Sequence, residues 1–213
     1  MDNNDNRSNN KVTVEGIVES RCKFSHELYG EKFYEFTLGC KRTSEVMDYI
    51  PIMISDRLVD IKRIKCGDCL VLQGQFRSFN DNRGEKRKLK LVVFATEVYE
   101  NDESKNVNTI ILDGYICKQP MYRNTPLGRE IADLLLAVNR VYGKSDYIPC
   151  IAWGRNARFV DRLGIGTHVK IEGRIQSRNY LKHYQDGNEE ERTAYEVSVS
   201  RIDVVEMEEE QCE

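Results

Sequence analysis

Residues 48–51 read Asp-Tyr-Ile-Pro, and residues 146–149 read Asp-Tyr-Ile-Pro again, 98 positions further along the chain. Around this tetrapeptide the similarity extends in both directions, so that residues 12–64 align with residues 110–162 without a gap. After one inserted residue the alignment resumes, and it then pairs glycines with glycines. A repeat this long predicts a duplicated domain of roughly 95 residues rather than a solenoid of short units.

The repeat divides the chain into two domains with polar segments around them. We expect the first domain over residues 11–100 and the second over residues 108–205, with residues 101–107 as a polar linker. Residues 1–10 are polar, have no apolar signal core and are expected to be disordered. Residues 206–213 form an acidic tail.

The composition is that of a globular chain. Its 213 residues are 40% hydrophobic and 31% charged, and no run approaches the ~18 apolar residues of a membrane helix. Seven scattered cysteines indicate reduced thiols and a cytoplasmic protein. The net charge of −3 does not exclude a nucleic-acid partner, because residues 206–213 hold five of the 35 acidic residues and residues 106–205 have 14 Lys and Arg against 12 Asp and Glu.

Both copies predict the same order of elements: three strands, a short helix and two further strands. The strands are expected over residues 12–18, 33–38, 49–54, 69–76 and 89–94, and over residues 110–116, 131–138, 147–153, 168–175 and 195–199. The helices are expected around Leu58, Ile61 and Ile64 and around Phe159, Val160 and Leu163. This order is typical of the five-stranded Greek-key barrel that binds oligonucleotides or oligosaccharides, the OB fold. The predicted fold class is therefore all-β, with two tandem OB-fold barrels, each with a short helix between strands three and four.

Three segments of the second copy are similar to the core domain of bacterial single-stranded DNA-binding proteins. They are residues 151–157 (Ile-Ala-Trp-Gly-Arg-Asn-Ala), residues 166–180, and residues 193–197 (Thr-Ala-Tyr-Glu-Val). The first copy is connected to that family only through the internal repeat.

The resemblance implies a surface on which aromatic rings stack with bases and cations contact phosphates. The stacking positions are Tyr142, Tyr147, Trp153 and Tyr180, and the backbone-contacting positions are Arg155, Arg174 and Arg178, with Arg140 and Lys182 as additions. Such stacking contributes ~1–3 kcal/mol per base and is tolerant of sequence. Each neutralised phosphate changes the log–log salt slope by about −0.7 on a single strand.

The first copy departs from this pattern at three positions. Ser44, Ser55 and Asp81 stand where the second copy has Tyr142, Trp153 and Tyr180. The candidate binding residues that it retains or adds are Tyr49, Arg57, Phe79, Lys86, Arg87 and Lys88. The last three belong to a basic run that is either a phosphate contact or a solvated turn. We therefore expect weaker stacking in this copy, which would serve electrostatic binding, assembly or the holding of a partner.

Other features have simpler interpretations. Tyr147 and Trp153 could be core residues of a strand, and Arg155 could lie on the solvated face of a helix. Cys66 and Cys69 have metal-like spacing, but a structural zinc site needs four ligands and no second pair accompanies them, so two free thiols are expected. No motif for a catalytic nucleophile, a cofactor or a metal is present, and we expect no enzyme and no cofactor.

These observations predict a sequence-tolerant single-stranded DNA-binding protein that protects DNA in replication, recombination or repair. By analogy with single-barrel relatives that form tetramers, two barrels in one chain suggest a homodimer with four barrels. The acidic end at residues 206–213 lacks the terminal hydrophobic residues with which the family recruits replication and repair proteins, so the resemblance does not extend that recruitment to this chain. Two alternatives remain open: an adaptor or replication-restart accessory that acts through protein contacts, and an RNA-binding protein.

Overall fold

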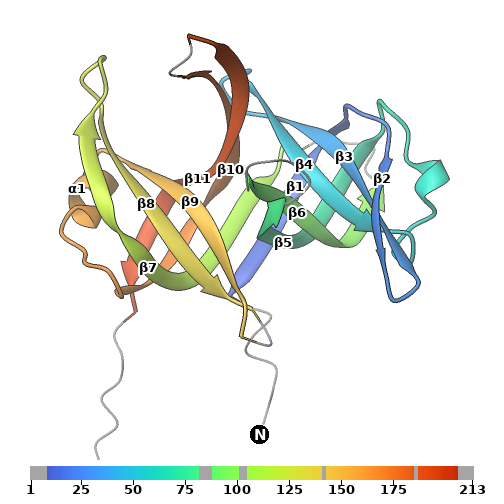
Figure 1. The fold of residues 1–213 in the computed structure, drawn as a ribbon, viewed down its shortest axis with the longest axis horizontal. Helices are drawn as coiled ribbons and strands as arrows, with labels where there is room; N and C mark the ends of the chain where they lie inside the picture. The colour runs from blue at the N-terminus through green and yellow to red at the C-terminus, as the bar shows by residue number, and fades with distance from the viewer. Residues whose placement is uncertain (1–8, 82–87, 101–104, 141–142, 185–186, 206–213) are drawn as a thin grey trace, which may run out of the picture.

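The computed structural model describes residues 9–81, 88–100, 105–140, 143–184 and 187–205. Figure 1 shows two barrels side by side. The first copy contains β1 (Asn10–Val18), β2 (Lys23–Leu28), β3 (Glu31–Lys41), β4 (Met47–Ser55), a 3-10 turn η2 (Ile61–Arg63), β5 (Cys69–Asp81) and β6 (Lys88–Glu100). The second contains β7 (Asn108–Asn124), β8 (Glu130–Asn139), β9 (Ser145–Trp153), α1 (Arg155–Val160), β10 (His168–His183) and β11 (Glu189–Val204). The predicted domain boundaries near residues 10, 100 and 206 coincide with the ends of the described segments or lie beside them. The structure therefore does not test these boundaries, and they stay predictions.

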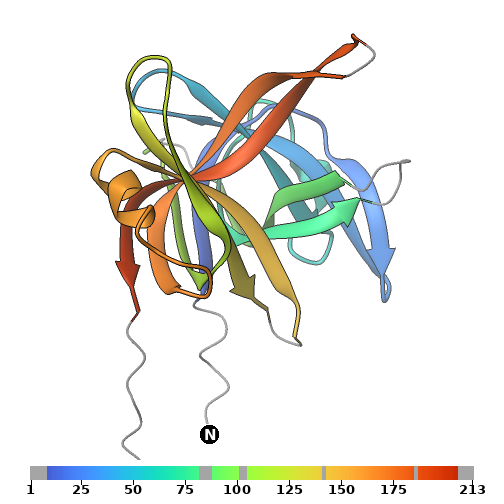
Figure 2. The same cartoon turned by 60° about the vertical axis from the view of Figure 1, so that its left-hand side comes forward.

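Each copy closes into a barrel with the same strand order. In the second copy β7 pairs with β8, β8 with β9, β9 in parallel with β11, β11 with β10, and β10 again with β7. In the first copy β1 and β2 together take the place of β7, and the parallel pair is β4 with β6. This is the Greek-key order that the sequence predicts. The predicted strands are all present, and the fourth and fifth strands of each copy extend into a hairpin arm, which Figure 2 shows clearly for β10 and β11.

Alternation along the strands sends one side chain in two into the barrel interior. On β9, Ile148, Cys150 and Ala152 are buried against the core, as are their first-copy equivalents on β4. Most buried hydrophobic side chains of both barrels form one continuous cluster, and a second, smaller cluster contains Phe33, Met53 and Val92. Consequently, the aromatic residues directly before and after these positions on β9, Tyr147 and Trp153, lie on the outer face of the sheet.

Glycines allow the barrels to close. A Cβ atom at Gly16 would lie 2.3 Å from the carbonyl oxygen of Gly39, and one at Gly114 would lie 2.5 Å from that of Ala137. Backbone therefore approaches backbone where the first strand coils across the barrel, as the central glycine of that strand predicts.

The two barrels are joined by an antiparallel ladder between β1 and β7. Val12 lies opposite Ile110, its own equivalent in the repeat, and Val14 lies opposite Asn108. Pairing between equivalent residues means that a local two-fold axis relates the copies at this ladder. The two copies therefore join their sheets into one eleven-stranded sheet.

The predicted helices differ between the copies. The second copy forms α1 and buries Ala157 and Val160. The first copy forms only the 3-10 turn η2, capped by the Asp60 side chain, which accepts from the backbone N–H of Lys62. Val59 and Asp60 have low helix propensity, which favours the shorter turn. In the described part of the chain, no helix is long and apolar enough to cross a membrane.

Candidate nucleic-acid interface

The outer face of β9 exposes the two aromatic residues that the sequence singles out there. Tyr147 is 47% exposed and Trp153 is 37% exposed. They share this face with Ile151, which is buried and lies between Asp133 and Ser198 on the neighbouring strands, whereas Ile148 and Cys150 point into the barrel. The alternative that Tyr147 and Trp153 are core residues therefore does not hold, and both rings are accessible to a ligand.

The arm formed by β10 and β11 contributes a third exposed ring. Tyr180 is 38% exposed, and the guanidinium of Arg178 lies 5.9 Å from the centre of its ring. Lys182 lies 5.1 Å from the ring of Tyr184 further along the arm. Arg178 also approaches the carboxylate of Glu196, at 3.8 Å. Rings and cations therefore alternate along this arm, as binding to a single strand requires.

The remaining candidates are more dispersed. Arg155 is exposed at the first position of α1, after Gly154, whose φ of +52° favours glycine. Arg57 is exposed and lies 3.6 Å from the carboxylate of Glu31. Tyr49 is 47% exposed, as is its equivalent Tyr147.

Some candidates lie outside what the structure describes. Tyr142, Lys86 and Arg87 are outside the described residues, and Lys88 is described only as the first residue of β6. The roles proposed for these four residues stay predictions.

Two predicted phosphate contacts, Arg140 and Arg174, bind carboxylates at the junction between the copies. Arg140 donates from Nε to Oδ2 of Asp146 at 2.6 Å and from Nη2 to the carbonyl oxygen of Ser78 at 2.8 Å. Arg174 reaches from the second copy to Oδ2 of Asp48 in the first, at 3.0 Å. A phosphate would have to share these guanidinium groups with a carboxylate.

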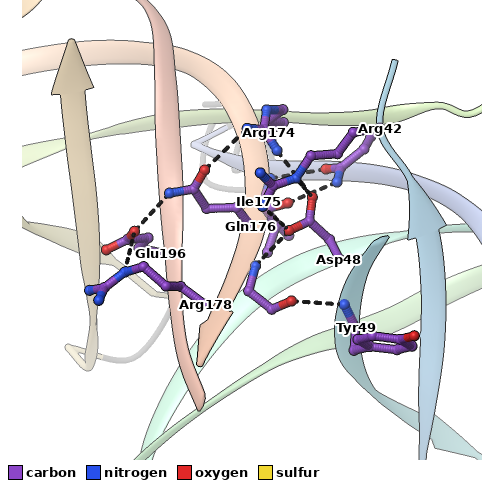
Figure 3. A network of polar contacts seen from close by, with 10 residues as sticks. Arg42, Asp48, Tyr49, Arg174, Ile175, Gln176, Arg178 and Glu196 are labelled. Atoms are coloured by element: carbon purple, nitrogen blue, oxygen red, sulfur yellow. Dashed lines mark hydrogen bonds and ion pairs between the residues drawn. The ribbon is translucent and has the colours of Figure 1, made fainter. Parts of the chain in front are cut away.

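Asp48 is completely buried and accepts hydrogen bonds from both copies. Arg42 donates to it from Nε at 2.6 Å, and the backbone N–H of Ser177 donates to Oδ1 at 2.8 Å. Figure 3 shows Arg42 and Arg174 converging on this carboxylate. Burial, followed by the charge of Arg42, lowers the pKa of Arg174, while Asp48 opposes the shift.

The junction is repeated on the other side of the two-fold axis. Asp146 accepts from Arg140 and from the backbone N–H of Ser78. The backbone N–H of Tyr147 donates to Oγ of Ser78 at 2.8 Å, and that of Tyr49 donates to Oγ of Ser177 at 2.9 Å. The repeated tetrapeptide thus supplies the carboxylate that joins the copies and, one residue later, an exposed tyrosine. The sequence marked this tetrapeptide by its repetition but did not reveal its contacts.

Comparison with known proteins agrees with this geometry. Residues 107–205 match the model of the Single-strand binding protein family. Single-stranded DNA-binding protein 1 of Staphylococcus aureus (strain COL) is 38% identical over 81 residues, which are 35% of this chain and 48% of that protein. Single-stranded DNA-binding protein A of Bacillus subtilis (strain 168) is 37% identical over 81 residues, 35% of this chain and 47% of that protein. The chain thus spans about half the length of the curated relatives it matches.

A solved structure matches nearly the whole chain. The wild-type single-stranded DNA binding protein from Thermus aquaticus superimposes with a TM-score of 0.77, covering 96% of each chain at 19% sequence identity. At this identity the likeness shows the fold, and it confirms the tandem OB-fold architecture. The family match thus covers the second copy, residues 107–205, and the structural match extends the tandem fold over nearly the whole chain.

Proposed function

We propose that this protein binds single-stranded DNA without sequence preference and uses the outer face of the second copy to do so. Bases stack on Tyr147, Trp153 and Tyr180, while Arg178, Lys182 and Arg155 contact phosphates. Binding of this kind protects exposed single strands during replication, recombination or repair. The match of residues 107–205 to the Single-strand binding protein family supports DNA binding without catalysis, and the mode of binding described here is part of the proposal.

The observation that supports this mode most directly is the exposure of Trp153 on the face opposite the core. A large aromatic ring on the solvent side of a strand gains little from folding, whereas a nucleobase can stack on it with ~1–3 kcal/mol. The half-exposed Tyr147 on the same strand and the Arg178–Tyr180 pair on the adjoining arm extend the surface in two directions.

Trp153 is the only tryptophan and therefore reports on its own site. We expect oligo-dT to quench its fluorescence to saturation, with an affinity that falls as salt rises by about −0.7 in log–log slope per phosphate contacted. Binding in a separate assay without quenching would contradict the role of Trp153. A folded protein that binds no DNA at either of two salt concentrations would contradict the function and favour an adaptor.

A competition experiment addresses RNA. Stacking does not involve the 2′-hydroxyl, so matched oligo-dT and oligo-rU should be compared at one salt concentration. A clear preference for the RNA would overturn the choice of DNA.

We also propose a homodimer with four barrels. Light scattering should then give twice the chain mass of 24.8 kDa, and a monomer would contradict this part of the proposal.

A further inference from the structure

The first copy carries an aromatic cluster on its outer face that has no counterpart among the described residues of the second. Phe33, Met53 and Val92 are buried there, apart from the barrel core, and Phe79 and Phe94 pack against them. We call these five residues the Phe33 patch. It lies on the outer side of β3, β4, β5 and β6, the same side of the sheet as the exposed Tyr49.

Planar and cationic groups lie on the Phe33 patch. The exposed imidazole of His26 stacks on Phe33, with ring centres 4.9 Å apart and an angle of 15° between the planes. The guanidinium of Arg77 lies 3.9 Å from the centre of the Phe94 ring, and the ammonium of Lys90 lies 5.8 Å from that of Phe79.

The charge of this surface is positive on balance. Lys90 forms an ion pair with Glu35. In the described part of the chain, the guanidinium of Arg77 donates to the neutral amide oxygen of Gln75, at 2.9 and 3.2 Å, and to no carboxylate. Arg77 also interacts electrostatically with Asp146 and with Arg140 of the second copy. A planar ring and an arginine on one apolar surface are groups that bind a base and its phosphate.

The second copy has other residues at these positions. It has Ile131 in place of Phe33, Ser198 in place of Phe94, and Arg178 in place of Phe79. Arg123, rather than a ring, lies opposite Ile131 on the neighbouring strand. The cluster is therefore particular to the first copy and is not required by the barrel.

We propose that the Phe33 patch, with His26, Arg77 and Lys90, is a second base-stacking site for the same single strand. This inference rests on the proposed function and extends it to the first copy, where His26 and Phe79 are the stacking rings. The sequence comparison predicts weaker stacking in this copy because Ser55 and Asp81 replace aromatic residues. The proposal instead places the stacking on His26 of β2 and Phe79 of β5.

The test combines His26→Ala with Phe79→Ala and uses oligo-dT of two lengths. A short oligomer of about 8 nucleotides can occupy one barrel, whereas one of about 35 nucleotides can cover both. We expect the double variant to bind the long oligomer at least about fivefold more weakly per stacked base lost, and to occlude fewer nucleotides per chain. Quenching of Trp153 by the short oligomer should remain within twofold of the wild-type value.

Phe24→Ala is the matched control. Phe24 lies on the same strand as His26 but contacts Tyr34, its partner on β3, in an edge-to-face arrangement. Tyr34 packs against the barrel core and does not belong to the Phe33 patch. Its removal should leave both lengths of DNA bound as before. Because Phe79 is half-buried, circular dichroism should verify folding, and His26→Ala alone, at an exposed position, should still give a measurable part of the loss.

The outcomes are distinguishable from failure of the proposed function. Unchanged affinity and occluded length in the double variant would overturn the second site, as would an equal loss in Phe24→Ala. A double variant that binds DNA normally but changes its oligomeric mass would assign the patch to a protein contact and overturn the proposal. If dT leaves Trp153 unquenched in the wild type while the double variant loses affinity for the long oligomer, the second-copy site fails and this one stands.

Discussion

At one position on the outer face, the second barrel has Trp153 and the first has Ser55. The tryptophan is 37% exposed, whereas the serine is 7% exposed and donates a hydrogen bond to Glu31. The backbones around them share strand order and closure. The duplicated barrel therefore fixes where the outer face lies, and the residues placed there decide which part of it can stack with bases.

The same contrast recurs at the junction, where the two copies exchange residue types. Gln75 and Arg77 on β5 take the positions of Arg174 and Gln176 on β10, counting from the equivalent glycines 74 and 173. Arg174 therefore reaches Asp48 across the junction, whereas Arg77 lies over Phe94 within its own barrel. The Asp48 side of the junction therefore has an additional ion pair with Arg174. On the Asp146 side, the equivalent strand instead places Arg77 over the Phe94 ring.

The largest expected effect comes from removing the junction carboxylates. Asp48→Ala leaves Arg42 and Arg174 without their shared partner, and breaking such a buried pair costs about 3–5 kcal/mol. Asp146→Ala loses one arginine contact and should cost less, about 2–3 kcal/mol. Urea unfolding followed by circular dichroism measures both losses in stability. Asp203→Ala, which removes an exposed ion pair with Arg201, is the control and should change stability by less than about 1 kcal/mol. A larger loss of stability for Asp146→Ala than for Asp48→Ala would contradict the idea that the second arginine on Asp48 makes that side of the junction the stronger one.

A second pair of variants separates joining from DNA binding. Arg174→Ala removes the contact with Asp48 and should lower stability by about 1.5–3 kcal/mol while leaving the salt dependence of dT binding nearly unchanged. Arg178→Ala, on the same arm, should leave stability within about 0.5 kcal/mol and reduce the magnitude of the salt slope by about 0.7. If Arg174→Ala instead reduces the slope and spares stability, Arg174 is a phosphate contact, as the resemblance implies.

The sequence predicts the barrels because their information is local and repeated. Alternation on residues 147–153 places Tyr147 and Trp153 on one face, and the glycines mark where strands cross; both predictions are confirmed. The junction could not be predicted in this way, because Asp48 and Arg174 are 126 residues apart and meet only after both barrels have formed.

The first-copy cluster escaped prediction for the same reason. His26 meets Phe33 through the β2–β3 register, and Phe94 joins them because β6 lies parallel to β4. Neither pairing follows from the repeat, because the second copy has no aromatic residue at these positions.

The smallest expected effects come from Ser78 and Ser177, each of which accepts a hydrogen bond from a tyrosine backbone N–H of the other copy. Ser78→Ala removes the oxygen that accepts from the backbone N–H of Tyr147 but leaves the backbone bonds of Ser78 to Asp146 and Arg140 intact, so it isolates one hydrogen bond worth about 1 kcal/mol. Ser177→Ala does the same for Tyr49 and should cost less, because that bond is exposed to water. In urea unfolding, the double variant should lose the sum of the two within about 0.5 kcal/mol if the two sides of the junction act independently. A deviation from additivity larger than that value would mean that the two sides of the junction unfold together. The additional arginine contact of Asp48 would then stabilise both barrels and not only its own side.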